Sequence, residues 1–124
     1  MVESVLDHSG RIVERKTPEL VRSGIVKPDT LKVVREGMRQ ATQSGTISSF
    51  YSFKGPIYGK TGSAQTGPNE KIYSWFTGFL DSPQLPLVLT VMLEGGRGGD
   101  RTAAPVAREV LDWYATHRNI SLDN

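Results

Sequence analysis

The sequence has no cysteine, so it contains neither a disulfide framework nor a thiolate metal site. Its 2 histidines, His8 and His117, lie far apart, and neither has a second histidine near it at ligand spacing. We therefore expect no metal and no cofactor. No apolar run approaches the length of a membrane-spanning helix, and we expect no direct membrane contact from this chain.

A large excess of charge of one sign is also absent. The 15 lysines and arginines are balanced by 13 acidic residues, which leaves a net charge of +2. The basic residues are scattered without aromatic residues between them, a pattern typical of a solvated surface rather than of a nucleic-acid patch. A chain of 124 residues can bury one core, so we expect one domain and no nucleic-acid partner.

The first half of the chain predicts a hairpin and a helix. Short apolar runs on either side of a turn-rich triplet predict a β-hairpin over residues 3–15. A helix is predicted over residues 28–43, with Pro28 in its first turn and Gly45 just after its end. Its apolar residues recur at steps of three and four and form one stripe: Leu31, Val34, Met38 and Ala41.

The second half predicts a sheet and another helix. Three strands are predicted: residues 57–65, 72–80 and 85–93. The connections at Gly67-Pro68-Asn69 and Asp81-Ser82-Pro83 are short enough for antiparallel neighbours. A helix is predicted over residues 102–117, with Thr102 as its N-cap. The predicted fold class is therefore α+β, an antiparallel sheet of three or more strands with the C-terminal helix packed on one face.

Apolar residues occupy both faces of the second and third predicted strands. We therefore expect the sheet to be covered on both sides, in part by material outside this chain. Trp75 and Phe76 are expected to pack in the core. The glycine-rich segment 95–100 predicts a flexible loop. The last helix has a predicted buried face made of Ala103, Ala107, Val110 and Trp113.

Residues 60–63 form the most informative motif in the sequence. Lys60 supplies a positive charge, and Thr61 and Ser63 supply hydroxyl donors. Gly62 has no Cβ, so a ligand can come close to the main chain. On a strand, these residue types together predict a compact site for an anionic group.

The same segment also looks like a phosphate-binding loop at first sight. From Gly55, the spacing to the Gly59-Lys60 pair is one residue too short for the Gly-x-x-x-x-Gly-Lys pattern. A phosphate-binding loop must also open directly into a helix, and the residues after the motif include Gly67 and Pro68 and have no helical period. The sequence therefore does not favour nucleotide binding.

Further segments accompany the motif in order along the chain: Glu36-Gly37-Met38, Gly45-Thr46, Ser74 to Phe79, and Ala103 to Ala107. With Lys60-Thr61-Gly62, they make the chain resemble the C-terminal part of the transpeptidase domain of class B penicillin-binding proteins. The resemblance runs over nearly the whole chain. The family usually has threonine where Ser63 stands, which keeps the hydroxyl.

The resemblance implies a serine D,D-transpeptidase that cross-links peptidoglycan and binds β-lactams. It implies that Lys60 sets the positive field of the cleft and that Thr61 and Ser63 bind the carboxylate of a D-alanyl-D-alanine stem peptide or of a β-lactam. Gly62 would let substrate lie along the strand, and the Ser63 N–H would be one of two oxyanion donors. Lys60 and Ser63 are thus the implied catalytic residues. The parent protein would lie outside the cytoplasm, in the periplasm or on the outer face of the membrane.

One departure from the family is decisive. The family carries Ser-x-x-Lys and Ser-x-Asn elements ahead of its Lys-Thr-Gly strand, and no serine of this sequence has either spacing. We therefore expect one wall of an acyl-transfer site, which is catalytically inactive alone. Two alternatives stay open: a non-catalytic sensor for β-lactams or stem peptides, and a structural half that assembles with another chain. The expected partners are a second copy or the missing remainder of the domain.

Overall fold

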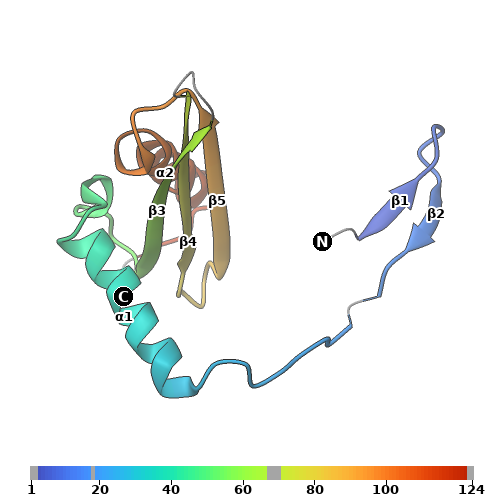
Figure 1. Ribbon diagram of the computed structural model, residues 1–124, viewed down its shortest axis with the longest axis horizontal. Coiled ribbons are helices and arrows are strands. Elements are labelled where there is room, and N and C mark those ends of the chain that lie inside the picture. Colours follow the sequence, from blue (N-terminus) through green and yellow to red (C-terminus); the bar gives the residue numbers. More distant parts are fainter. Residues whose placement is uncertain (1–2, 18, 67–70, 123–124) are drawn as a thin grey trace.

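The computed structural model describes all residues except 1–2, 18, 67–70 and 123–124. A hairpin, a helix, a three-stranded sheet and a C-terminal helix follow one another along the chain (Figure 1). The sheet is antiparallel throughout, and the C-terminal helix packs on one of its faces. The predicted α+β class is therefore confirmed.

The hairpin joins β1 (Ser4–Leu6) to β2 (Ile12–Arg15) through a turn that one carboxylate organises. Asp7 Oδ1 accepts the backbone N–H groups of Ser9 at 2.9 Å and Arg11 at 3.0 Å, as well as the Ser9 hydroxyl at 2.6 Å. The Ser9 hydroxyl, followed by the Arg11 amide, holds the pKa of Asp7 below its ordinary value of 3.8. An Asx-type turn of this kind fixes the hairpin locally.

The hairpin stands apart from the sheet, and residues 19–27 run as an extended segment toward the first helix (Figure 1). Its apolar side chains are exposed, among them Leu6 and Val13. Leu20 and Val21 in the following segment are each 81% exposed. Apolar residues exposed in such number mark a surface that another part of a protein covers.

The first helix, α1, spans Pro28–Gln43. It ends before Gly45, whose N–H donates to the Gln40 carbonyl oxygen at 2.9 Å. A Cβ at Gly45 would lie 2.8 Å from Ala41 Cα, so the tight end of the helix requires glycine.

The predicted apolar stripe of α1 is only partly buried. Met38 and Ala41 are half-buried, whereas Leu31 is 49% and Val34 is 53% exposed. The first turns of α1 extend beyond the sheet (Figure 1), so the described chain does not cover Leu31 and Val34.

Contacts from two side chains fix α1 to the sheet. The buried Thr42 hydroxyl donates to the Ile57 carbonyl oxygen at 2.8 Å. The guanidinium of Arg35 pairs with Asp81 at 2.6 Å and lies 5.0 Å from the centre of the Tyr58 ring. The helix is thereby held beside the strand that carries the Lys-Thr-Gly motif.

The sheet has three strands in the order of the sequence: β3 (Ile57–Thr66), β4 (Lys71–Leu80) and β5 (Leu87–Glu94). The third strand begins at Leu87, two residues later than predicted, because Leu85 belongs to a turn in which its N–H donates to the Ser82 carbonyl oxygen at 3.2 Å. The predicted turn at Gly67-Pro68-Asn69 lies outside the described residues. β3 is an edge strand of this sheet.

The core lies between the sheet, α2 (Ala104–His117) and a short 3-10 helix (Ser48–Phe50). Phe76 is fully buried, as predicted, and its ring stacks on that of Phe50 with centroids 5.3 Å apart. Other fully or nearly fully buried members of this cluster are Ile47, Ala103, Ala104, Ala107 and Leu111.

The predicted buried face of the C-terminal helix is correct at Ala103 and Ala107, which are fully buried, and wrong at its other two residues. Its buried residues are Ala104, Ala107, Leu111 and Ala115. Val110 is exposed and Trp113 is 59% exposed, so their prediction as buried residues is wrong. The stripe of small residues lets the helix lie close to the sheet, and this orientation turns Val110 and Trp113 to the solvent side.

The start of this helix also differs from the prediction. A π-helical turn (Gly99–Ala103) precedes α2. Thr102 lies inside this turn and is not an N-cap, because its hydroxyl accepts the N–H of Arg97 at 2.9 Å.

The second face of the sheet, which we call the outward face, is largely uncovered in the described chain, apart from Tyr58 and Phe79, whose rings lie under Arg35 of α1. Strand alternation places Phe76 inward and Trp75 outward, and Trp75 is 41% exposed, so its prediction as a core residue is wrong. Val88 and Met92 on β5 share the outward face and are 76% and 46% exposed. Apolar residues are therefore present on both faces, as predicted, but this chain covers mainly one of them.

Candidate functional site

The Lys-Thr-Gly-Ser segment lies in the middle of β3. Its register against β4 pairs Gly62 with Trp75 and Ser63 with Ser74. The other edge of β3 has no strand partner among the described residues. Backbone groups at that edge are available to a further extended chain.

Lys60 and the two hydroxyls project from opposite faces of the strand. Lys60 lies on the outward face, and Thr61 and Ser63 lie on the face that carries the π-helical turn. Lys60 Nζ donates to the Thr61 carbonyl oxygen at 2.5 Å, so that carbonyl faces the free edge. The alternation of an antiparallel ladder then puts the Ser63 N–H on the same edge. Lys60 Nζ, the Thr61 carbonyl oxygen and the Ser63 N–H therefore lie together at this edge.

The ammonium group of Lys60 is exposed to solvent. Within the described part of the chain, no ion pair joins it to a carboxylate. Its positive charge is therefore available to an anionic ligand.

The hydroxyls of Ser63 and Ser74 bind two consecutive amides of the glycine-rich segment. Ser63 Oγ accepts the N–H of Gly99 at 3.1 Å, and Ser74 Oγ accepts the N–H of Gly98 at 3.2 Å. Ser74 is fully buried. The segment is thus attached to the middle of β3 and β4, next to the motif.

This arrangement corrects the prediction of a flexible loop over residues 95–100. Gly98 and Gly99 are buried, and a Cβ at Gly99 would lie 2.6 Å from the Gly62 carbonyl oxygen. The sequence analysis missed Ser74, Gly98 and Gly99. The available signal was a pair of glycines immediately before a helix, where a backbone can approach another backbone closely.

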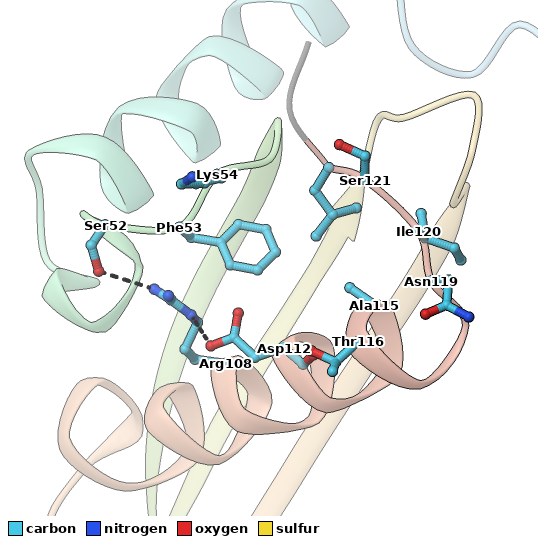
Figure 2. Close-up of a pocket in the computed structure, with 11 residues that line it drawn as sticks. Ser52, Phe53, Lys54, Arg108, Asp112, Ala115, Thr116, Asn119, Ile120 and Ser121 are labelled. Carbon is cyan, nitrogen blue, oxygen red and sulfur yellow. Dashed lines mark hydrogen bonds and ion pairs between the residues drawn. The ribbon is translucent and has the colours of Figure 1, made fainter.

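A separate cavity of about 710 Å³ lies between the C-terminal half of α2, residues 52–54 and the segment 119–122 (Figure 2). The guanidinium of Arg108, the most prominent charged group in this cavity, already has partners within the chain. Its Nε pairs with Asp112 at 2.6 Å, and its Nη1 donates to the Ser49 carbonyl oxygen at 3.0 Å. Residues 60–63 do not line this cavity. We therefore assign Arg108 a structural role.

The described residues contain neither a metal site nor a membrane-spanning helix. Across the described ranges, no three His, Asp or Glu side chains come together in a group able to hold a metal ion. No helix in those ranges has the length and apolar character needed to cross a membrane.

The fold corresponds to part of the transpeptidase domain of penicillin-binding proteins. PBP2 from Pseudomonas aeruginosa, solved in complex with WCK 5153, superposes with a TM-score of 0.67 at 27% identity, over 86% of this chain and 24% of that one. The transpeptidase domain of FtsI4 from Legionella pneumophila gives a TM-score of 0.64 at 24% identity, over 73% of this chain and 37% of that one.

Residues 1–112 match the family model of the penicillin binding protein transpeptidase domain. Because this match covers most of the sequence, the chain belongs to that family. Peptidoglycan D,D-transpeptidase MrdA of Haemophilus influenzae is 37% identical over 76 residues, 50% of this chain and 12% of the relative. Penicillin-binding protein H of Bacillus subtilis is 27% identical over 118 residues, 88% of this chain and 16% of the relative. The chain thus spans a small part of the length of these relatives.

Proposed function

We propose that this chain forms the substrate-binding wall of a peptidoglycan D,D-transpeptidase that also binds penicillin. Lys60 gives the cleft its positive field, and Thr61 and Ser63 bind the carboxylate of a stem peptide or a β-lactam. The Ser63 N–H serves as one of two oxyanion donors, and the other belongs to a nucleophile-bearing segment outside this sequence. The observation that best supports this proposal is that residues 60–63 lie on β3, which has a free edge, in a chain that belongs to the transpeptidase family.

The geometry around Gly62 supports a ligand that binds as an added strand. A Cβ at Gly62 would meet only Trp75 Cβ among the described atoms, at 3.5 Å, which is an ordinary contact. Packing within the chain therefore does not require glycine at this position. A missing side chain at a free strand edge instead favours close approach by an extended peptide.

Two other functions compete with this one. A non-catalytic sensor for β-lactams or stem peptides would use the same edge without turnover. A structural half would complete its site against another chain. The exposed outward face and the exposed Val110 and Trp113 of α2 favour that candidate. Turnover of a stem peptide by a complete domain that contains this chain distinguishes a transpeptidase from a sensor. Size-exclusion chromatography with light scattering shows whether the chain assembles with another chain.

Membership of this family also supports a proposal for where the protein works and what it binds. We propose that the protein that carries this chain works outside the cytoplasm, where peptidoglycan stem peptides and β-lactams are encountered. Its partners in this proposal are those small ligands and either the remainder of the transpeptidase domain or a second copy of the chain.

The isolated chain should form no covalent adduct with penicillin. Acylation needs a serine activated by a neighbouring base, and no serine of this sequence has the family's lysine spacing. The measurement is the intact mass of the chain after incubation with excess benzylpenicillin, with an active penicillin-binding protein treated in parallel as the positive control. A stoichiometric adduct on any serine of this chain would show that the nucleophile is present after all.

The isolated chain should also self-associate at micromolar concentration. Val88 and Met92 on the outward face and Trp113 on α2 are exposed, and the edges of β3 and β5 are open to further strands. Size-exclusion chromatography with light scattering should show a dimer or a larger assembly, and Val88→Lys should weaken it. A clean monomer that binds no hydrophobic dye would contradict this expectation.

A further inference from the structure

The glycine-rich segment ahead of α2 contacts the motif through its backbone alone. The N–H of Gly99 donates to Ser63 Oγ at 3.1 Å, and the N–H of Gly98 donates to Ser74 Oγ at 3.2 Å. Because Ser63 and Ser74 are paired across β3 and β4, the two bonds lie side by side. Two parallel bonds hold the segment at one position relative to the motif.

The same contact requires glycine. A Cβ at Gly99 would lie 2.6 Å from the carbonyl oxygen and 2.8 Å from the nitrogen of Gly62, and it would also meet the Trp75 carbonyl oxygen. These obstacles are backbone atoms of paired strands, so they cannot move aside as a flexible side chain would. Any side chain at position 99 therefore separates the segment from the motif.

We propose that Gly99 is a positioning residue that orients the Ser63 hydroxyl toward the carboxylate of the substrate. The inference rests on the proposed function of Ser63. A hydroxyl has one hydrogen to donate and two lone pairs to accept with. The Gly99 amide occupies one lone pair, and none of the hydrogen bonds among the described residues uses the Ser63 hydrogen. That hydrogen is left to donate to an anionic ligand at the free edge.

Gly99 also restricts how Ser63 moves. Without the amide, the Ser63 hydroxyl can rotate and donate to water or to a nearby carbonyl, and the productive rotamer becomes one of several. With the amide in place, the oxygen is held before substrate arrives. Pre-organisation of a donor in this way saves the cost of ordering it during binding.

The test is Gly99→Ala in a complete transpeptidase domain that contains this chain, with Gly37→Ala as the matched control. A Cβ at Gly37 meets nothing within 4 Å, so the control makes the same chemical change in open space. The measurement is the second-order acylation rate with benzylpenicillin and with its methyl ester, which lacks the carboxylate charge. Gly99→Ala should slow acylation by benzylpenicillin about tenfold or more, as expected for a lost bond to a charged group. Its effect on the ester should be clearly smaller, and Gly37→Ala should change neither rate.

The outcomes separate this inference from the proposed function. If the unmodified domain reacts with neither compound, the proposed function itself fails. A second outcome is that the unmodified domain reacts, while Gly99→Ala slows acylation by both compounds equally or by neither. In that case Gly99 does not position the Ser63 hydroxyl for the carboxylate, and only the inference is overturned. Should Gly99→Ala not fold, Ser74→Ala removes the acceptor of the neighbouring amide without adding atoms. That variant should likewise slow acylation by benzylpenicillin more than acylation by the methyl ester, and an equal effect on both compounds would overturn the inference.

Discussion

Replacing Phe76 with alanine should lower the free energy of unfolding of this chain by about 3–5 kcal/mol. The side chain is fully buried, and its ring stacks on Phe50 at 5.3 Å. It also fills the space above two glycines of the sheet, since a Cβ at Gly59 or Gly78 would lie 2.8 Å from the ring. The neighbouring strands are hydrogen-bonded to one another, so they cannot collapse into the cavity that the ring leaves. Urea unfolding followed by far-ultraviolet circular dichroism at fixed chain concentration measures the loss.

The adjacent residue provides the control for this effect. Trp75 is a large aromatic residue on the same strand, but it lies on the outward face and is 41% exposed. Trp75→Ala should therefore cost about 1 kcal/mol. A larger loss for Trp75→Ala than for Phe76→Ala would show that the outward face is the real core, for example because a second copy of the chain covers it.

Much of the fold was predictable because local patterns in this chain agree with its tertiary structure. The apolar runs and the short turn at Asp81-Ser82-Pro83 predict β4 and β5 as antiparallel neighbours, and the structure pairs them so. Pro28 and Gly45 mark the two ends of α1 through backbone chemistry that needs no tertiary information. The boundary of β5 was less accurate, because Leu85 is apolar but is buried in a turn.

The wrong predictions of burial concern residues that the described chain leaves exposed. These residues are Trp75, Val110 and Trp113. A pattern of apolar residues predicts that they are buried, but it does not identify the part of the protein that covers them. Two faces of α2 carry apolar residues, and only tertiary packing decides which one meets the sheet. In this chain the alanine stripe does so, because small residues allow close approach.

The motif on β3 was evident in the sequence, but the residues that hold it were not. Lys60, Thr61 and Ser63 lie within four consecutive residues, so their chemistry can be read directly from the sequence. The bond from Gly99 to Ser63 joins residues 36 positions apart, and the bond from Gly98 to Ser74 joins residues 24 apart. Neither leaves a periodic signal, because the contacts depend on backbone amides and on the absence of side chains.

In a complete transpeptidase domain that contains this chain, Lys60→Ala should slow acylation by benzylpenicillin about a hundredfold or more. The group is exposed, has no carboxylate partner among the described residues, and lies at the free edge where the substrate is proposed to bind. Its charge and hydrogen bonds would act on negative charge that develops in the transition state, inside a cleft where water is excluded. The same change should alter the free energy of unfolding by only about 0–1 kcal/mol, because an exposed lysine contributes little to stability.

Three further variants show which property of the motif matters. Lys71→Ala makes the matched change at another exposed strand lysine and should leave acylation unchanged. Ser63→Thr keeps the hydroxyl and the backbone donor on a residue suited to strands, so it should be nearly neutral. Ser63→Val keeps the shape of threonine without the hydroxyl and should slow acylation by carboxylate-bearing β-lactams. Acylation rates and melting temperatures are measured for these three variants, for Lys60→Ala and for the unmodified domain. If Lys60→Ala lowers the melting temperature sharply and leaves the acylation rate intact, Lys60 stabilises the sheet instead, and the assignment of the site to the free edge of β3 is wrong.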